Sequence, residues 1–173
     1  GDALTSEIIL NSLKQLDTLK PIVVSMGNVA ASGGYYIASN ANKIFADPMT
    51  ITGSIGVFAA LPNLKGLVDN LGINAEQVST HANAMGYSMF EPLQEGYKKT
   101  TKAAIEMIYE KFKSHVAEGR SMNLEQVEEI AQGRVWSGKE ALEVGLVDEL
   151  GGLQAAIKSA ASLAEITTYN VIE

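Results

Sequence analysis

The chain of 173 residues is 46% hydrophobic and 19% charged, a balance that suits one domain with a hydrophobic core. Its formal net charge of −7 and its lack of a basic run argue against nucleic acid as a partner. The absence of cysteine excludes disulfides, a thiolate nucleophile and thiolate metal sites. No apolar run has the length of a membrane span, no signal peptide opens the sequence, and the chain begins at Gly1 without a methionine. We therefore expect a single domain over residues 1–173, truncated at its N-terminus.

The first half of the chain alternates apolar stripes at helical spacing with short runs of β-branched residues. In chain order these patterns predict a helix over 5–19, a strand over 21–26, a helix over 35–41, a strand over 43–46, a glycine-punctuated turn and strand over 52–58, a helix over 63–71 and a strand over 73–79.

The second half is richer in helices. A loop is predicted over 81–90, followed by a long helix over 92–118, a helix over 124–131, an extended segment over 135–138, a helix over 139–144, a strand over 146–150 and a last helix ending at residue 164. Asn123 is the expected N-cap of the helix that begins at residue 124, with Gln126 as its capping-box partner. Strands that alternate with helices favour an α/β fold with a mostly parallel sheet flanked by helices.

Ser32 is the candidate nucleophile. It stands between an apolar strand and a predicted helix, and Gly33 and Gly34 follow it without side chains. At such a turn the hydroxyl can project from the end of a sheet, while the free N–H groups of the helix start face the same space and can stabilise an oxyanion. The competing interpretation is that Ser32 is only the N-cap of the helix.

Three ordered motifs resemble those of the signal peptide peptidase A family, also called protease IV. They are Gly27-Asn28-Val29-Ala30-Ala31-Ser32-Gly33-Gly34-Tyr35-Tyr36, then Thr52-Gly53-Ser54-Ile55-Gly56-Val57, then Gly133-Arg134-Val135-Trp136-Ser137-Gly138 followed by Gly145-Leu146-Val147-Asp148. The resemblance covers nearly the whole chain and implies a Clp-protease/crotonase-like fold with serine protease chemistry and a lysine general base. It further implies an enzyme on the periplasmic face of the bacterial inner membrane that degrades cleaved signal peptides and forms a homo-oligomer, a tetramer.

The resemblance also implies roles for individual residues. Ser32 matches the nucleophile, and the N–H of Gly33 matches one donor of the oxyanion hole. Ser54 matches the serine that orients the lysine amine. Gly1 matches the last glycine of a loop that supplies the other oxyanion donor, so the chain holds only a remnant of that loop.

The general-base lysine is where the sequence departs from the short members of the family. Alignment on Ser32 and Ser54 puts Ala84 at the position of that lysine, and alanine cannot accept a proton. The nearby Lys98, Lys99 and Lys102 begin a helix and are expected to be solvated. In the long, tandem members the N-terminal half brings the lysine and the C-terminal half brings the serine. The chain resembles that C-terminal half, so its partners are expected to be the N-terminal half of the same protein and a peptide substrate, and the fragment alone is expected to be inactive.

Other ionisable residues give weaker signals. His81 lies three residues before Ala84, yet no carboxylate stands out to orient its ring, so a loop histidine is the simpler interpretation. His115 is expected to interact with the C-terminal dipole of the long helix. Asp148 and Glu149 match a structural turn of the family. No residue spacing indicates a metal or a dinucleotide, and no cofactor is expected.

Two other classes of function remain open. A crotonase-like acyl-CoA enzyme would share the fold and the oxyanion hole but would use carboxylates. A non-catalytic assembly domain would use exposed side chains of the 81–90 loop as contacts, namely Met85, Tyr87, Met89 and Phe90.

Overall fold

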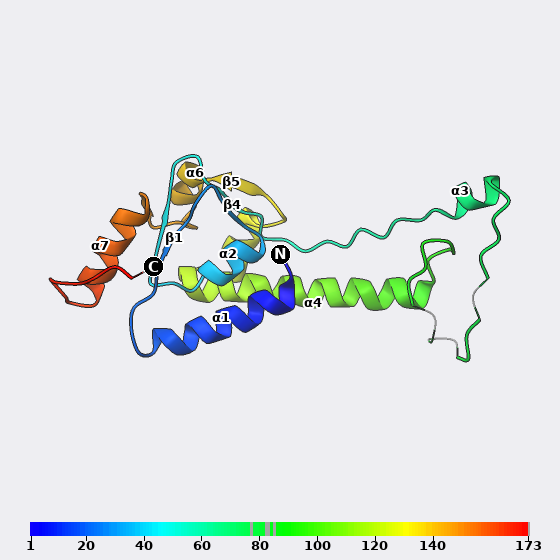
Figure 1. Cartoon of the computed structure of the whole chain (residues 1–173), viewed down its shortest axis with the longest axis horizontal. Coiled ribbons are helices and arrows are strands. Elements are labelled where there is room, and N and C mark those ends of the chain that lie inside the picture. Colours follow the sequence, from blue (N-terminus) through cyan, green and yellow to red (C-terminus); the bar gives the residue numbers. More distant parts are fainter. Residues whose placement is uncertain (77, 82–83, 85, 173) are drawn as a thin grey trace. The chain divides into compact units, whose positions relative to one another are not determined.

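The structure is a computed structural model that describes residues 1–76, 78–81, 84 and 86–172 (Figure 1). The chain groups into two compact units. The core unit comprises Gly1–Gly56 and Tyr109–Glu173, and the inserted unit comprises Val57–Ile108. Helix α4 (Glu95–Arg120) begins in the inserted unit and ends in the core unit.

Two small sheets form the centre of the core unit. The first sheet has the order β1-β3-β6 and is parallel throughout. The second has the order β2-β4-β5, in which β2 and β4 are parallel and β5 is antiparallel to β4. The strands are β1 (Val23–Ser25), β2 (Val29–Ala31), β3 (Lys43–Ala46), β4 (Ile51–Gly53), β5 (Val135–Ser137) and β6 (Glu149–Leu150). The chain therefore passes twice from the first sheet to the second: from β1 to β2, and again from β3 to β4.

The prediction of a mostly parallel sheet flanked by helices is confirmed, with one correction near Ser32. The predicted strand over 21–26 is β1, but it ends at Ser25, and a second strand, β2, leads into Ser32. Strand β2 consists of Val29, Ala30 and Ala31, which are too few and too small to give a periodic pattern. Its partner in the sheet, β4, holds it in place instead.

Helices cover these sheets, and α1, α5 and α6 begin at side-chain caps. Asp2 caps α1 by accepting a hydrogen bond from the Thr5 N–H at 2.7 Å. The predicted capping box of Asn123 and Gln126 is present, and Ser137 and Glu140 form another. The helices of the core unit are α1 (Ala3–Asp17), α2 (Gly33–Ala38), the end of α4, α5 (Leu124–Ile130), α6 (Gly138–Glu143) and α7 (Leu153–Leu163).

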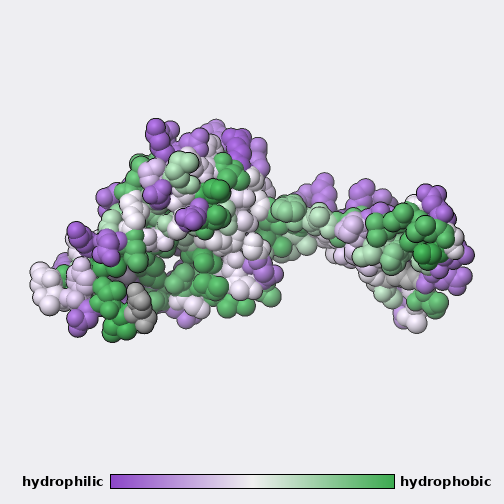
Figure 2. Space-filling model, turned by 45° about the horizontal axis from the view of Figure 1, so that its top comes forward, coloured by the Kyte–Doolittle hydropathy of each residue, from purple (hydrophilic) through white to green (hydrophobic). Residues whose placement is uncertain are grey.

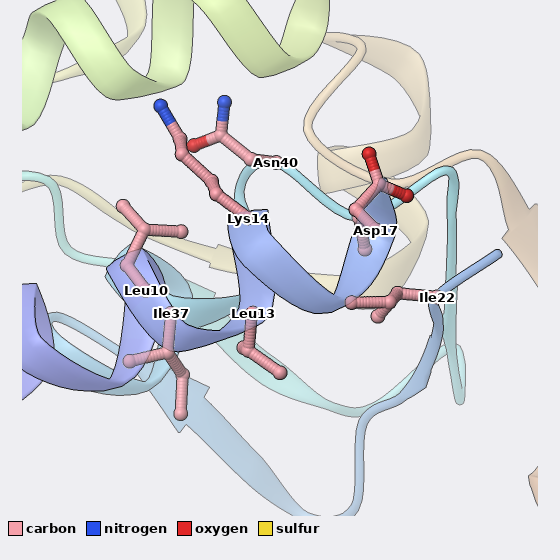
Figure 3. A pocket seen from close by; sticks show the side chains of 8 residues that line it. Leu10, Leu13, Lys14, Asp17, Ile22, Ile37 and Asn40 are labelled. Carbon is pink, nitrogen blue, oxygen red and sulfur yellow. The ribbon is translucent and has the colours of Figure 1, made fainter. Parts of the chain in front are cut away.

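Helix α1 packs on α2 through an apolar face. Leu10 is 1% exposed, and with Leu13 and Ile37 it lines a small cavity of about 10 Å³ between the two helices (Figure 3). Lys14 and Asn40 point from the same place toward α4. The hydrophobic core continues beneath with further buried side chains, among them Tyr35, Ile44, Ile55, Phe112, Val116 and Leu146. Helix α1 is therefore fixed on the element that begins next to Ser32.

Gly119 in α4 allows a close approach to the chain that follows α2. A Cβ at this position would lie 2.1 Å from the carbonyl oxygen of Ser39. Alanine normally stabilises a helix relative to glycine by about 1 kcal/mol. We expect Gly119→Ala to have the opposite effect and to lower the free energy of unfolding by at least about 2 kcal/mol, because the backbone must shift. Denaturant unfolding of the variant measures this change.

A matched control is Gly66→Ala in α3, where no described atom lies within 4 Å of the added Cβ. This variant should be as stable as the natural chain or slightly more stable. Equal stabilities for the two variants would contradict the packing of α4 against Ser39.

The inserted unit contains α3 (Lys65–Asn70) and the beginning of α4. The Leu64 N–H donates to the Met89 carbonyl at 2.7 Å, and the Tyr87 ring stacks on Tyr97 with 6.4 Å between ring centroids. The predicted strand over 73–79 is wrong, because the described residues 73–76 and 78–79 have no strand partner. Hydrophobic side chains gather on the visible surface of this unit (right in Figure 2). Its exposed large hydrophobic residues include Phe58, Leu64, Leu67, Leu71, Ile73, Val78, Met89, Phe90 and Met107.

Among the described residues, no helix combines the length and the apolar character that crossing a membrane would require.

Candidate active site

Ser32 lies directly after β2 and at the N-cap position of α2. Its backbone has φ 53° and ψ −118°, a region that residues with a Cβ rarely occupy. Two hydrogen bonds hold this conformation: the Ser32 N–H donates to the Gly53 carbonyl at 2.9 Å, and the Tyr36 N–H donates to the Ser32 carbonyl at 2.8 Å. Within the described chain, the Ser32 side chain makes no hydrogen bond that caps α2. Because its hydroxyl is not used as a cap, the N-cap interpretation does not account for this residue.

Ser54 lies at the same edge of the second sheet. In the parallel register of β2 and β4, Ala31 is paired with Gly53, so Ser32 and Ser54 each come one residue after a paired position. Neighbouring strands lie about 4.8 Å apart. Ser54 also has a left-handed φ of 49°, and its N–H donates to the Arg134 carbonyl at 2.7 Å. The sheet therefore brings together two serines that are separated by 21 intervening residues in the sequence.

Gly1 lies against Gly33, the residue after Ser32. A Cβ on Gly33 would be 3.1 Å from the Gly1 Cα and 2.7 Å from the Ser6 Oγ. Only glycine fits this contact without movement of its neighbours, because real Cβ atoms do not approach that closely. The main chains of Gly1 and Gly33 thus meet next to Ser32.

Several lysines of the core unit form ion pairs with carboxylates, and Lys113 is the most buried of them. In the core unit, Lys113 is nearly buried between Glu110 and Glu128, both at 2.8 Å. Burial would lower the pKa of Lys113, but its hydrogen bonds to the two glutamates raise it above its usual value. Lys14, Lys43 and Lys111 also contact carboxylates. An amine that must accept a proton from serine has to be neutral, so the raised pKa of Lys113 favours the wrong form for a general base.

The lysines near Ala84 in the sequence belong to the inserted unit. Lys98 and Lys102 are 62% and 77% exposed and lie 3.6 and 3.7 Å from Glu95 and Glu106. The prediction that they are solvated is confirmed. Ala84 contributes its N–H to a turn by donating to the His81 carbonyl at 3.0 Å.

The two histidines have different environments. His81 is exposed, and its Nδ1 lies 3.0 Å from the Thr80 hydroxyl, which agrees with a loop residue. The expectation that His115 interacts with the C-terminal dipole of α4 is wrong. α4 continues to Arg120, so His115 lies before its last turn, and its Nε2 contacts Glu7 of α1 at 3.0 Å instead. His115 is therefore part of an interhelical cluster.

Asp148 is structural, as expected for a turn. Its carboxylate forms two hydrogen bonds with the Arg120 guanidinium, at 2.5 and 3.0 Å, and accepts the Ile44 N–H at 2.7 Å. Glu149 forms an ion pair with Lys43 at 2.7 Å. In residues 1–76, 78–81, 84 and 86–172, no group of three histidines or acidic residues is arranged to hold a metal ion.

Glu7 is a feature of the site region that sequence patterns did not reveal. Its carboxylate accepts hydrogen bonds from the Tyr36 hydroxyl at 2.6 Å and from Lys111 at 2.7 Å. Burial would raise the pKa of Glu7, but hydrogen bonds from Lys111, Tyr36 and Asn11 and the neighbouring His115 lower it to about 2, against a usual value of 4.5. Only its position on the buried side of α1, next to Ser6 and Leu10, could have drawn attention to it.

The lowered pKa of Glu7 predicts acid sensitivity. Ionised Glu7 stabilises the fold fully above its unfolded pKa of 4.5, and this contribution is lost as the pH falls from 4.5 toward 2. We expect the Tm of the natural chain to exceed that of Glu7→Gln at pH 7 and the difference to shrink across this window. Thermal unfolding followed by circular dichroism measures both profiles. Parallel profiles between pH 7 and 2 would contradict the prediction.

Comparisons with known proteins agree with this geometry. The family model described as "Peptidase family S49" matches residues 14–167. Protease 4 of Haemophilus influenzae is 42% identical over 164 residues, which cover 94% of this chain and 26% of that protein. The chloroplastic serine protease SPPA of Arabidopsis thaliana is 42% identical over 96% of this chain and 25% of its own length. A putative signal peptide peptidase SppA of Enterococcus faecium is 37% identical over 93% of this chain and 46% of its own. The chain thus spans a quarter to a half of these relatives.

A solved structure supports the fold. A point mutant of the 1510-N membrane-bound stomatin-specific protease superposes with a TM-score of 0.55 over 96% of this chain and 68% of that chain, at 18% sequence identity. This similarity confirms the predicted Clp-protease/crotonase-like fold. With the family match over most of its length, and with homologues named as proteases at 37–42% identity, the chain belongs to peptidase family S49.

Proposed function

We propose that this chain is the serine-bearing half of a Ser/Lys endopeptidase, with Ser32 as the nucleophile. The observation that carries the proposal is the strained backbone of Ser32 at the end of β2, combined with a hydroxyl that does not cap α2. Strained residues are found preferentially at functional sites, where the surrounding structure holds them. Membership of a peptidase family favours this function over acyl-CoA chemistry.

In the proposed reaction the Ser32 Oγ attacks the carbonyl carbon of a peptide bond and gives its proton to a neutral lysine amine. The carbonyl oxygen becomes an oxyanion and accepts hydrogen bonds from the N–H of Gly33 and of the loop that contains Gly1. The C–N bond then breaks, and the lysine ammonium gives its proton to the leaving amine. A water molecule, deprotonated by the same lysine, hydrolyses the acyl-enzyme and restores Ser32.

The general-base lysine is proposed to come from an N-terminal half of the same protein. Two observations support this. By the resemblance to short family members, the lysine position falls on Ala84, and the pKa of the nearly buried Lys113 is raised by its bonds to Glu110 and Glu128. Ser54, next to Ser32 at the sheet edge, is proposed to accept a hydrogen bond from the incoming amine and orient it.

The substrate and setting are also proposals. We propose that the enzyme degrades cleaved signal peptides at the periplasmic face of the bacterial inner membrane and acts as a homo-oligomer, a tetramer. A relative named signal peptide peptidase supports the substrate class. Exposed hydrophobic residues of the inserted unit, including Met89 and Phe90, would suit contacts between copies or an apolar peptide. Met85, which was expected to belong to the same surface, lies outside the described residues.

Covalent labelling tests the assignment. A fluorophosphonate should modify the full-length protein on Ser32, as shown by mass spectrometry of the tryptic peptides. Replacing the proposed general-base lysine of the N-terminal half by alanine should abolish this labelling. The matched control is the variant with Lys98, Lys99 and Lys102 all changed to alanine, which should be labelled at the natural rate. Loss of labelling in the control, or labelling on another residue, would contradict the proposal.

A further inference from the structure

Glu7 joins three helices of the core unit. It belongs to α1, accepts the hydroxyl of Tyr36 from α2 at 2.6 Å, and contacts Lys111 and His115 of α4 at 2.7 and 3.0 Å. Figure 1 shows α1 running alongside α4 with α2 beside it. The side chains of Glu7 and His115 are 17% and 14% exposed, so their contact is largely shielded from water, whereas Lys111 is about half exposed. The carboxylate therefore fixes where α1 lies on the other two helices.

Tyr36 connects this junction to the nucleophile. Its N–H donates to the Ser32 carbonyl at 2.8 Å, while its hydroxyl reaches Glu7. Burial, the hydrogen bond to Glu7 and the charge of Glu7 all raise the pKa of Tyr36, so the hydroxyl stays protonated and remains a donor. One residue thus links the strained turn of Ser32 to α1 through both its backbone and its side chain.

The N-terminus of α1 holds Gly1 against Gly33. The Ser6 Oγ and N–H both donate to the Asp2 carbonyl, at 2.8 and 3.0 Å, and so fix the residue that follows Gly1. Ser6 is 6% exposed, and its Oγ lies 2.7 Å from the position that a Cβ of Gly33 would take. Any movement of α1 relative to α2 would therefore move Gly1 relative to Gly33.

We infer that Glu7 and Tyr36 are positioning residues: their hydrogen bond sets α1 on α2 and thereby places the main chain of Gly1 against Gly33 at the oxyanion hole. The inference rests on the proposed function of Ser32. Neither side chain is assigned to the substrate or to the reacting atoms. Their effect is geometric, and small displacements of oxyanion donors are known to lower catalytic rates strongly.

Tyr36→Phe in the full-length protein is the sharpest test. The variant keeps the ring and its packing on Phe112, whose centroid lies 4.7 Å away, and removes only the hydroxyl. We expect kcat to fall by about tenfold or more while KM changes by less than about twofold, because the oxyanion donors act mainly in the transition state. The rate of fluorophosphonate labelling at Ser32 should fall with kcat, since the phosphonyl oxygen uses the same donors.

Tyr109→Phe is the matched control. Tyr109 also belongs to the core unit and donates its hydroxyl to a glutamate, Glu128, at 3.1 Å, but its hydroxyl, which accepts the Gln132 N–H at 3.1 Å as well, joins α4 to α5 and the residues just after it. The two variants should lose similar stability, as judged by Tm, while Tyr109→Phe keeps its kcat. Combining Tyr36→Phe with Glu7→Ala should lower kcat no further than Glu7→Ala alone, because alanine removes the acceptor of the Tyr36 hydroxyl and both changes break the same hydrogen bond.

Equal kcat and labelling rates for Tyr36→Phe and Tyr109→Phe would overturn the inference while leaving the nucleophile in place. A rise in KM with an unchanged kcat would overturn it as well, since that pattern indicates substrate binding. Absence of labelling at Ser32 in the natural protein would instead overturn the proposed function, and the inference with it. Failure of the inference alone is thus distinguishable from failure of the function on which it rests.

Discussion

Changing Ser32 to alanine in the full-length protein is expected to lower kcat/KM for peptide hydrolysis by at least about 10³-fold. The proposed acyl-enzyme needs the Ser32 Oγ, and alanine has no atom in its place. Alanine keeps a Cβ, so the cost of the left-handed φ of 53° is the same in both proteins. Hydrolysis of a fluorogenic apolar peptide measures the loss, and an unchanged Tm shows that the fold is intact.

Ser114→Ala provides the control for this experiment. Ser114 is exposed on α4, and its hydroxyl donates only to the Glu110 carbonyl of the preceding turn. The control should turn over peptides at the natural rate. Natural turnover by Ser32→Ala would remove Ser32 from the mechanism and with it the proposed function.

Gly33→Ala is expected to lower kcat by about 10²-fold to 10³-fold, as the loss of an oxyanion donor does. The new Cβ would lie 2.7 Å from the Ser6 Oγ and 3.1 Å from the Gly1 Cα. Gly1 and the start of α2 would have to separate, and the two proposed oxyanion donors would no longer converge. Steady-state kinetics with the same peptide, supported by the Tm of the variant, measure the effect.

The neighbouring Gly34→Ala separates crowding at the oxyanion hole from a general effect on α2. A Cβ at position 34 would meet the Ala30 Cβ at 4.0 Å, an ordinary contact. This variant should keep its kcat and be equally or more stable, because alanine favours the helix. Equal losses in the two variants would contradict the role of the Gly1 and Gly33 contact.

Local signals in the sequence were sufficient for most of the core unit. Asn123 and Gln126 are close in the chain, so their capping box could be predicted, and the apolar Ile44, Phe45 and Ala46 marked β3. Strand β2 could not be predicted in this way. Its extended conformation comes from pairing with β4 and not from the β propensity of its own residues. The segment over 73–79 shows the reverse error: Ile73 and Val78 suggested a strand, yet its described residues have no partner strand.

The candidate site was predictable to a similar extent. The small residues around Ser32 placed a turn there, and the sheet register then brought Ser54 to the same edge. The left-handed φ of Ser32 and the contact between Gly1 and Gly33 depend on atoms from separate elements, which no local pattern encodes. The same holds for Glu7, whose partners Tyr36 and Lys111 are 29 and 104 residues away.

The order of strands in the second sheet has a consequence for how the fold forms and varies. Strands β2 and β4 pair early in the chain, but β5 joins β4 only after the whole inserted unit, Val57–Ile108, has been traversed. Pairing across so long a loop makes folding slow, because loop closure precedes any gain from the new contacts. The equilibrium cost of the loop, however, grows only logarithmically, by about 0.6 kcal/mol for each doubling of its length. The second sheet can therefore tolerate inserts of very different lengths at this point, while the edge that carries Ser32 and Ser54 stays the same.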